Sequence, residues 1–522
     1  MKPITTSLLL ISGLAAQAQL PPYVASDFGT DEQGYYFIIN MNFMGGSNAQ
    51  AQAVIFDGAG HVAFRKTVFY GSNFRVWPDG RMSYAAGGKH LFMDSTFTVI
   101  DTVTTVNGIL PDLHDIQVLD NGHYLLLGVE NLTMDLSGYP VFQHNNTPGS
   151  ATAIVESVVI QELDSAKNLL WEWHGADHFD FLDTDTSRLQ NPAEVDWTHS
   201  NAVEMDMDGN VLLSSRHFNE ITKIDRDADT IMWRMGGVRN QFTFVNDPGF
   251  FLQHDIRRLP NGHVTLFDNS KPGAHPGRGV EYALDESTLM AMPVWSRAHD
   301  PGAYSRAMGN MQRLDNGNTL IGWGALNPDN AVFTVYRPDS TLVCELYFPD
   351  TLVSYRSYYF EELPFALHRP VITCTPEGNV FQLTAEPVGT TYLWSTGATS
   401  QTIIVTATDT VFVDIPVGSG GTLRSEPFVP GAECLSTGSG AMPREDRPRI
   451  WPNPSGAALN VMLGDSGRPV QVELIDALGK VLWRTTSAEN TLRLSLGALD
   501  AGLYFIRMDG TAHRFIKSAD VD

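Results

Sequence analysis

One repeated turn constrains the fold of this chain more than any other feature. Five stretches share one form, an apolar run, a turn that contains glycine, and a second apolar run: WPDGRMSYA (77–85), LDNGHYLLL (119–127), MDMDGNVLLS (205–214), LPNGHVTLF (259–267) and LDNGNTLIG (314–322). Glycine accepts the positive φ of a tight turn, so each stretch is typical of a β-hairpin.

A second hairpin follows each of these turns, as in IQELDSAKNLLWEWHG (160–175), and an extra pair of strands stands in front at 35–66. Two hairpins make a four-stranded sheet, and six such units fill roughly residues 30–350. Four-stranded units that repeat every ~40–55 residues are typical of a β-propeller. The sequence therefore predicts an all-β chain with a six-bladed β-propeller over residues 19–365. The alternative, a string of β-sandwiches, would not repeat so regularly.

The length and charge of the chain limit its organisation and its partners. A chain of 522 residues is too long for one core, so about two to four domains are expected. The formal net charge of −25 argues against nucleic acid and anionic membranes as partners. An anionic substrate therefore needs a local basic site.

The N-terminus has the features of a secretory signal peptide. Lys2 precedes an apolar run at residues 7–16, and AQA ending at Ala18 fits a cleavage site, so residues 1–18 are the predicted signal peptide. The apolar run is too short to span a bilayer, and no later run qualifies. We therefore expect an exported protein without a transmembrane segment.

The pattern changes after about residue 370. Residues 370–435 have short alternating strands and resemble a small immunoglobulin-like module, which predicts a β-sandwich, and the Gly/Ser/Pro-rich stretch 436–448 is a linker. Residues 449–522 resemble the C-terminal sorting domain of the type IX secretion system, through PNPS (452–455), DALGK (476–480), GLYFIR (502–507) and a closing FIKS. This resemblance implies a second β-sandwich, the secretion machinery as a partner, and passage through the periplasm to the cell surface or the medium.

Three cysteines are spread along the chain. Cys374 and Cys434 bracket the predicted module, and an exported protein can form disulfides, so these two can pair. Cys344 is then left as a buried thiol in an apolar strand. No CxxC motif is present, which argues against a thiolate zinc site.

Three histidines occupy matching places in the repeat. His114 and His254 each lie eight residues before a turn glycine, and His199 lies ten before Gly209, where the turn is two residues longer. The first strand of each blade lines the central channel of a propeller, so equivalent positions on different blades converge. The sequence predicts that the three side chains form one site. A three-histidine metal site is the chemical alternative, because imidazole clusters bind zinc.

Three segments resemble the bacterial arylsulfate sulfotransferases. Residues 196–237 carry DWTHSN, SSRH and the IxKID…IxWRxGG hairpin, and 253–286 and 305–324 are similar to the next two blades of that family. The resemblance implies a six-bladed propeller that moves a sulfuryl group from one phenol to another through a sulfated histidine. It implies no nucleotide sulfate donor, no other cofactor and no metal; the partners are an aryl sulfate and a phenolic acceptor.

The same resemblance implies roles for particular residues. His254 of LQHD matches the sulfated histidine, and the other catalytic positions match His199, Arg216 of SSRH, and His114. Neutral imidazole is a nucleophile near pH 7, and a guanidinium stabilises sulfuryl oxygens. His114 or His199 can donate a proton to the leaving phenolate.

Two further residues are candidates for substrate binding. Asn201 lies two residues after His199, on the same strand face. Trp197 can stack on an aromatic ring or serve as a core anchor, and both interpretations remain open.

Two other classes of function remain possible for such a chain. A surface propeller can bind a ligand without turnover, and a histidine cluster can serve a metal-dependent hydrolase or sulfatase. A pure binder has no need of the full set His114, His199, Arg216 and His254, which favours the transferase. Donor, acceptor and oligomeric state are not specified by the sequence.

Overall fold

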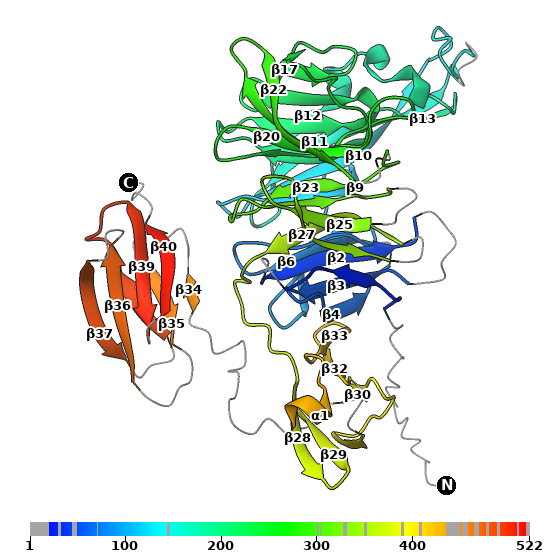
Figure 1. The fold of residues 1–522 in the computed structure, drawn as a ribbon. Coiled ribbons are helices and arrows are strands. Elements are labelled where there is room, and N and C mark those ends of the chain that lie inside the picture. Colours follow the sequence, from blue (N-terminus) through cyan, green and yellow to red (C-terminus); the bar gives the residue numbers. More distant parts are fainter. Residues whose placement is uncertain are drawn as a thin grey trace, which may run out of the picture.

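The structure is a computed structural model of the full chain (Figure 1). It describes residues 20–29, 33–43, 50–69, 71–142, 147–299, 302, 304–326, 331–348, 352–387, 391–406, 410–434, 449–451, 458–463, 469–476, 480–487, 491–508 and 511–517. The predicted signal peptide 1–18, the linker 436–448 and the PNPS stretch lie outside these residues. No helix among the described residues is long and apolar enough to cross a membrane.

The described part of the chain is all-β, as predicted. Its helices are one turn each: η1 (Gly175–Asp177), η2 (Phe181–Asp183), η3 (Thr186–Arg188), η4 (Arg216–Phe218) and α1 (Pro430–Glu433). Between residues 35 and 360 the strands form sheets, and each sheet contains four strands that pair in antiparallel fashion.

The sheets follow one another along the chain. The first sheet contains β27 (Val353–Phe360), β2 (Tyr35–Met41), β3 (Gln52–Asp57) and β4 (Val62–Thr67), and the second contains β5 (Ser72–Val76), β6 (Met82–Ala86), β7 (Lys89–Met93) and β8 (Val99–Val103). The third contains β9 (Leu110–Val118), β10 (Tyr124–Met134), β11 (Ala153–Leu163) and β12 (Leu169–His174), and the fourth contains β14 (Ser200–Met205), β15 (Val211–Ser215), β16 (Glu220–Asp225) and β17 (Thr230–Gly236). The fifth contains β19 (His254–Arg258), β20 (Val264–Asp268), β21 (Arg278–Asp285) and β22 (Met290–Ala298), and the sixth contains β23 (Asn310–Arg313), β24 (Thr319–Gly322), β25 (Ala331–Tyr336) and β26 (Leu342–Tyr347). Three short strands add to these sheets: β1 (Val24–Ser26) pairs with β26, β18 (Thr243–Phe244) with β22, and β13 (Glu194–Asp196) with the first part of β11.

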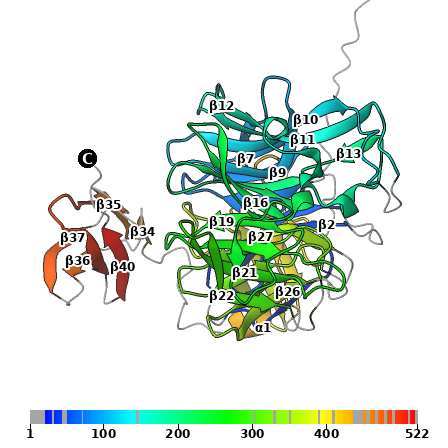
Figure 2. The same ribbon diagram turned by 90° about the horizontal axis from the view of Figure 1, so that it is seen from above.

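The first strands of the sheets form a closed ring. They contact one another in the order β27, β5, β9, β14, β19, β23 and back to β27. β27 comes from the C-terminal end of this region and pairs with β2, so the front strands 35–66 do not form a sheet by themselves. The closed order of contacts makes the ring propeller-like, and the view from above shows β9, β19 and β27 near its middle (Figure 2).

The segment after residue 370 is joined to the first sheet. β28 (Val371–Glu377), β29 (Val380–Glu386) and β31 (Thr402–Val405) form one small sheet, whereas β30 (Leu393–Trp394), β32 (Val413–Val417) and β33 (Gly421–Arg424) continue the first sheet through pairing of β33 with β4. Phe64 of β4 and Trp394 belong to the same hydrophobic core. These strands therefore cover the outer edge of the first sheet (Figure 1).

The cysteine predictions are confirmed. Cys374 and Cys434 form a disulfide that closes a segment of 60 residues. Cys344 lies outside it, buried in β26, with its sulfur 3.3 Å from the hydroxyl oxygen of Tyr36.

The C-terminal strands form two further small sheets with a core of their own. One contains β34 (Arg449–Trp451), β35 (Ala458–Met462) and β38 (Thr491–Ser495); the other contains β37 (Val481–Ser487), β36 (Val470–Asp476), β39 (Gly502–Met508) and β40 (Thr511–Lys517). GLYFIR falls on β39, and FIK of the closing motif on β40.

Candidate active site

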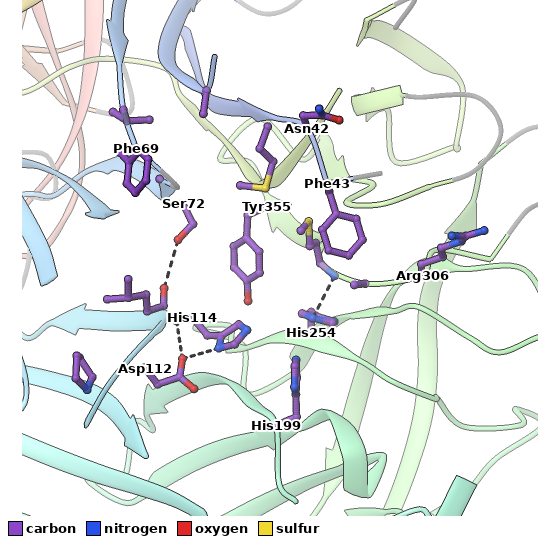
Figure 3. Close-up of a pocket in the computed structure, with 18 of the residues that line it drawn as sticks. Asn42, Phe43, Phe69, Ser72, Asp112, His114, His199, His254, Arg306 and Tyr355 are labelled. Atoms are coloured by element: carbon purple, nitrogen blue, oxygen red, sulfur yellow. Dashed lines mark hydrogen bonds and ion pairs between the residues drawn. The ribbon is translucent and has the colours of Figure 1, made fainter. Parts of the chain in front are cut away.

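A cavity of about 1320 Å³ opens at one end of the ring. The four residues expected to be catalytic, His114, His199, Arg216 and His254, all line it. Figure 3 shows the three histidines side by side in the cavity. His114 belongs to β9, His199 directly precedes β14, and His254 begins β19, so three neighbouring first strands bring the histidines together. Arg216 comes from η4, directly after β15.

The backbone at this end of the ring adopts unusual conformations. His199, Asp255 and Met308 have φ values of 43°, 60° and 68°. Positive φ costs free energy in residues other than glycine and persists where the surrounding structure enforces it, often at functional sites. Here it occurs where the first strands begin, and the pairing register of β14 and of β19 is interrupted close by.

His254 is held in one orientation by both ring nitrogens. Nδ1 lies 2.7 Å from Oδ1 of Asn269 and 3.1 Å from the carbonyl oxygen of Leu252, and Nε2 accepts a hydrogen bond of 3.1 Å from the Met308 amide. Two oxygen acceptors at Nδ1 place the proton there and leave the lone pair on Nε2. Burial lowers the pKa of His254 well below its usual value, and the charge of Arg216 lowers it further. His254 is therefore a neutral imidazole at neutral pH.

His114 has the opposite electrostatic setting. Its Nδ1 lies 2.5 Å from Oδ1 of Asp112 on the same strand. Burial lowers the pKa of His114, but the charge and hydrogen bond of Asp112 outweigh this, and the net pKa is raised. The protonated form of His114 is thus favoured, as suits a proton donor.

His199 is subject to both effects, burial and a neighbouring carboxylate. Its ring centroid is 5.1 Å from that of His114 and 4.6 Å from that of His217. Burial lowers its pKa, and the hydrogen bond that Nδ1 makes with Asp196 opposes this only in part. Burial, together with the charge of His199, lowers the pKa of His217 to about 3.

Arg216 provides a buried positive charge at the site. One amino group donates a 2.8 Å hydrogen bond to the carbonyl oxygen of Arg306, and Nε is buried without a partner among the described residues. Burial and the nearby charge of Arg188 lower the pKa of Arg216 to about 10, so the guanidinium stays charged at neutral pH. A buried N–H without a partner is available to an oxygen of a bound anion.

The two residues expected to bind substrate do not line the cavity. Asn201 is fully buried and donates a 2.7 Å hydrogen bond to the carbonyl oxygen of Gln253, which ties β14 to the residue before His254. Trp197 is 1% exposed, packs against Phe218, and donates to the carbonyl oxygen of Phe181. The structure thus places Trp197 as a core anchor, because its indole fills the space between the third and fourth sheets.

Several residues at the site escaped sequence reasoning. Asp112, Asn269 and Tyr355 contact the histidines directly but stand outside the repeated histidine position. Asn269 ends the motif HVTLFDN, so the resemblance could have drawn attention to it. Phe43 and Phe69 line the cavity with 47% and 76% of their surface exposed, and supply an apolar rim.

Comparison with known families gives two matches. A family model described as Arylsulfotransferase (ASST) matches residues 29–356, and one described as a secretion system C-terminal sorting domain matches residues 449–519. No curated protein matches the chain.

The solved structures that match the chain share little sequence with it. A protein of unknown function from Bacteroides caccae has 11% identity over 63% of this chain and 100% of its own, with a TM-score of 0.39. Virginiamycin B lyase from Staphylococcus aureus has 9% identity over 69% and 95%, with a TM-score of 0.31. The β-propeller domain of Cps50 (Swd1) from Myceliophteria thermophila has 9% identity over 70% and 96%, with a TM-score of 0.33.

Proposed function

Because the chain belongs to the arylsulfotransferase (ASST) family, we propose that it transfers a sulfuryl group from a phenolic sulfate ester to a phenolic acceptor through a sulfohistidine at His254. No nucleotide sulfate donor takes part. The observation that carries the proposal is the setting of His254, a neutral imidazole with its lone pair fixed on Nε2 in a cavity that also holds His114, His199 and Arg216.

The first half-reaction sulfates the enzyme. Nε2 of His254 gives up its hydrogen bond from the Met308 amide and attacks sulfur; the S–N bond forms and the S–O bond to the donor phenol breaks. His114 gives the departing phenolate a proton, which its raised pKa makes available. Arg216 stabilises the charge on the sulfuryl oxygens.

The second half-reaction reverses these roles. The acceptor phenol loses its proton to His114, its oxygen attacks sulfur, and the S–N bond breaks with the electron pair returning to Nε2. Asn269 is a neutral acceptor, so the proton on Nδ1 stays in place in the intermediate. The leaving group is then a neutral imidazole rather than an imidazolate, which keeps the sulfohistidine reactive.

The whole chain fits an exported enzyme. We propose that the ring is a six-bladed propeller over residues 19–365, followed by the module 370–435, the linker 436–448 and the domain 449–522, after removal of the signal peptide 1–18. The C-terminal match bears out the predicted type IX sorting domain, which indicates secretion to the cell surface or the exterior. The type IX machinery is thus the expected partner in export.

A second candidate function is metal-dependent hydrolysis. Asp196, His199 and His217 place ligand atoms within 4.8 Å of one another, a set that suits a divalent cation. The buried charge of Arg216 beside them disfavours a bound cation. We therefore rank this candidate second, with water as the acceptor in place of a phenol.

Incubation with a chromogenic aryl sulfate alone tests the proposal. The expected result is one sulfuryl group on a peptide that contains His254, and phenol release that accelerates when a phenolic acceptor is added. His254→Ala should lose both, whereas His263→Ala, a histidine in the turn after β19, should keep both. An adduct on another residue, or activity that disappears with a chelator, would contradict the proposal and favour the metal-dependent alternative.

A further inference from the structure

Tyr355 lines the cavity beside His114 and His254. It lies in β27, the strand that closes the ring, and is 6% exposed. Its hydroxyl is buried and has no hydrogen-bond partner among the described residues. Buried hydroxyl groups are normally satisfied, so an unsatisfied one in a cavity points to a ligand atom that completes it.

The hydroxyl points into the space between the histidines. Figure 3 shows it directed towards the gap between His114 and His254, with His199 below. The Tyr355 ring centroid lies 5.7 Å from that of His114 and 6.3 Å from that of His254. A sulfuryl group bound for transfer to Nε2 of His254 would occupy this space, so its oxygens come within reach of the hydroxyl.

The tyrosine is held in place by its neighbours. The guanidinium carbon of Arg356 lies 5.4 Å from the ring centroid. The carbonyl oxygen of Tyr355 accepts a 2.9 Å hydrogen bond from the Gly309 amide, next to the Met308 amide that binds His254. Burial raises the pKa of the hydroxyl above its usual value, so the group is a hydrogen-bond donor at physiological pH and not a base.

We propose that the Tyr355 hydroxyl donates a hydrogen bond to a non-bridging oxygen of the sulfuryl group as it moves between the phenolic oxygen and His254. The inference rests on the proposed function and adds a second hydrogen-bond donor to that of Arg216. No bond to Tyr355 forms or breaks, and its proton stays on the hydroxyl oxygen. The group acts because charge on the non-bridging oxygens must be stabilised throughout the transfer.

Tyr355→Phe removes the hydroxyl and keeps the ring. With a series of aryl sulfates whose phenols differ in acidity, kcat should fall on the order of 10²-fold, the loss seen for one preorganised donor. The loss should be equal across the series, because a non-bridging oxygen is unaffected by the choice of phenol. Sulfation of His254 by donor alone should slow by the same factor. Tyr359→Phe, on the same strand with its hydroxyl bonded to the Gly34 amide, is the matched control.

Two kinetic outcomes would overturn the assignment. One is a Tyr355→Phe enzyme as fast as the unchanged protein. The other is a loss that grows as the phenol becomes less acidic, which would place the hydroxyl on the bridging oxygen as a proton donor.

Binding of inorganic sulfate, measured by calorimetry, keeps the test independent of turnover. The unchanged protein should bind sulfate, and Tyr355→Phe should bind it about 10-fold or more weakly, the effect of one hydrogen bond to a charged group. Equal affinities, or no sulfate binding by either protein, would refute the role of Tyr355. A protein that turns over no aryl sulfate yet shows this difference would refute the transferase proposal alone.

Discussion

Burial and nearby charge shift the pKa values of the three histidines in different directions. His254 and His199 are driven towards the neutral form by burial, whereas Asp112 keeps His114 protonated to higher pH than an ordinary histidine. The three residues share one repeat position, yet only His114 has a carboxylate two residues before it on its own strand. One nucleophile and one proton donor can therefore coexist within a single cluster.

Asp112→Asn tests this division of roles. As the pH rises through the pKa of His114, the proton needed by the leaving phenolate is lost, so the rate of enzyme sulfation falls on the alkaline side. Removing the carboxylate charge lowers that pKa and should move this limb to lower pH, with roughly a 10-fold loss of rate at neutral pH. Stopped-flow release of the first phenol measures it.

Asp315→Asn is the control for this substitution, since Asp315 is exposed in the turn between β23 and β24. A pH profile that stays in place in Asp112→Asn would exclude His114 as the proton donor. A shift of the acid limb instead would show that Asp112 controls the pKa of a group other than His114.

At the scale of the strands, a buried ionic network lies directly behind the site. His114, His254 and Tyr355 are each followed by a charged residue, Asp115, Asp255 and Arg356. Asp115 bonds Arg356 and Arg257 at 2.8 Å each, and Arg257 also reaches Asp255 at 2.8 Å. The network joins β9, β19 and β27 across the ring, so it fixes the strands that carry His114, His254 and Tyr355. It also gives Asp255, which follows His254, an ion-pair partner.

Asp115→Asn should destabilise the ring by about 3–5 kcal/mol, because it leaves buried guanidinium groups short of a counter-charge. The guanidinium groups of Arg257 and Arg356 hold the pKa of Asp115 at about 2 against the opposing effect of burial. This stabilisation is present above the unfolded pKa of about 3.9 and is lost as the pH falls towards 2. Denaturant unfolding at neutral pH measures the effect.

Asp339→Asn, an exposed carboxylate in the turn between β25 and β26, serves as the control for Asp115→Asn. A difference below about 1 kcal/mol between the two variants would show that the network is not a source of stability.

At the scale of the molecule, the catalytic ring and the sorting domain have separate cores. The C-terminal core draws its described residues from 459–515, whereas the module before it shares a sheet and a core with the ring. We therefore expect that the sorting domain can be removed without harm to the ring. Removal of the module 370–435 would instead expose the edge of the first sheet.

Ending the chain after residue 448 should leave an active enzyme that accumulates in the periplasm. Activity per molecule is expected to match the full-length protein, since no described residue of the cavity comes from beyond 355. Cell fractionation and an aryl sulfate assay on each fraction measure both effects. Normal surface display of the shortened chain would remove the sorting role, and loss of activity would show that the C-terminal sheets support the ring.

The sequence by itself determined the strands, the glycine turns and the repeated histidine, because these depend on residues a few positions apart. It also indicated the disulfide partners, since Cys374 and Cys434 bracket one segment. The tertiary structure decided the features that depend on distant residues. β27 completes the first sheet, and β33 extends it. Trp197 lies in the core, and Tyr355 lies beside His114, from which it is 241 positions away along the chain. The spacing of hydrophobic residues indicates which face of a strand is buried, but it does not indicate which strand pairs with it.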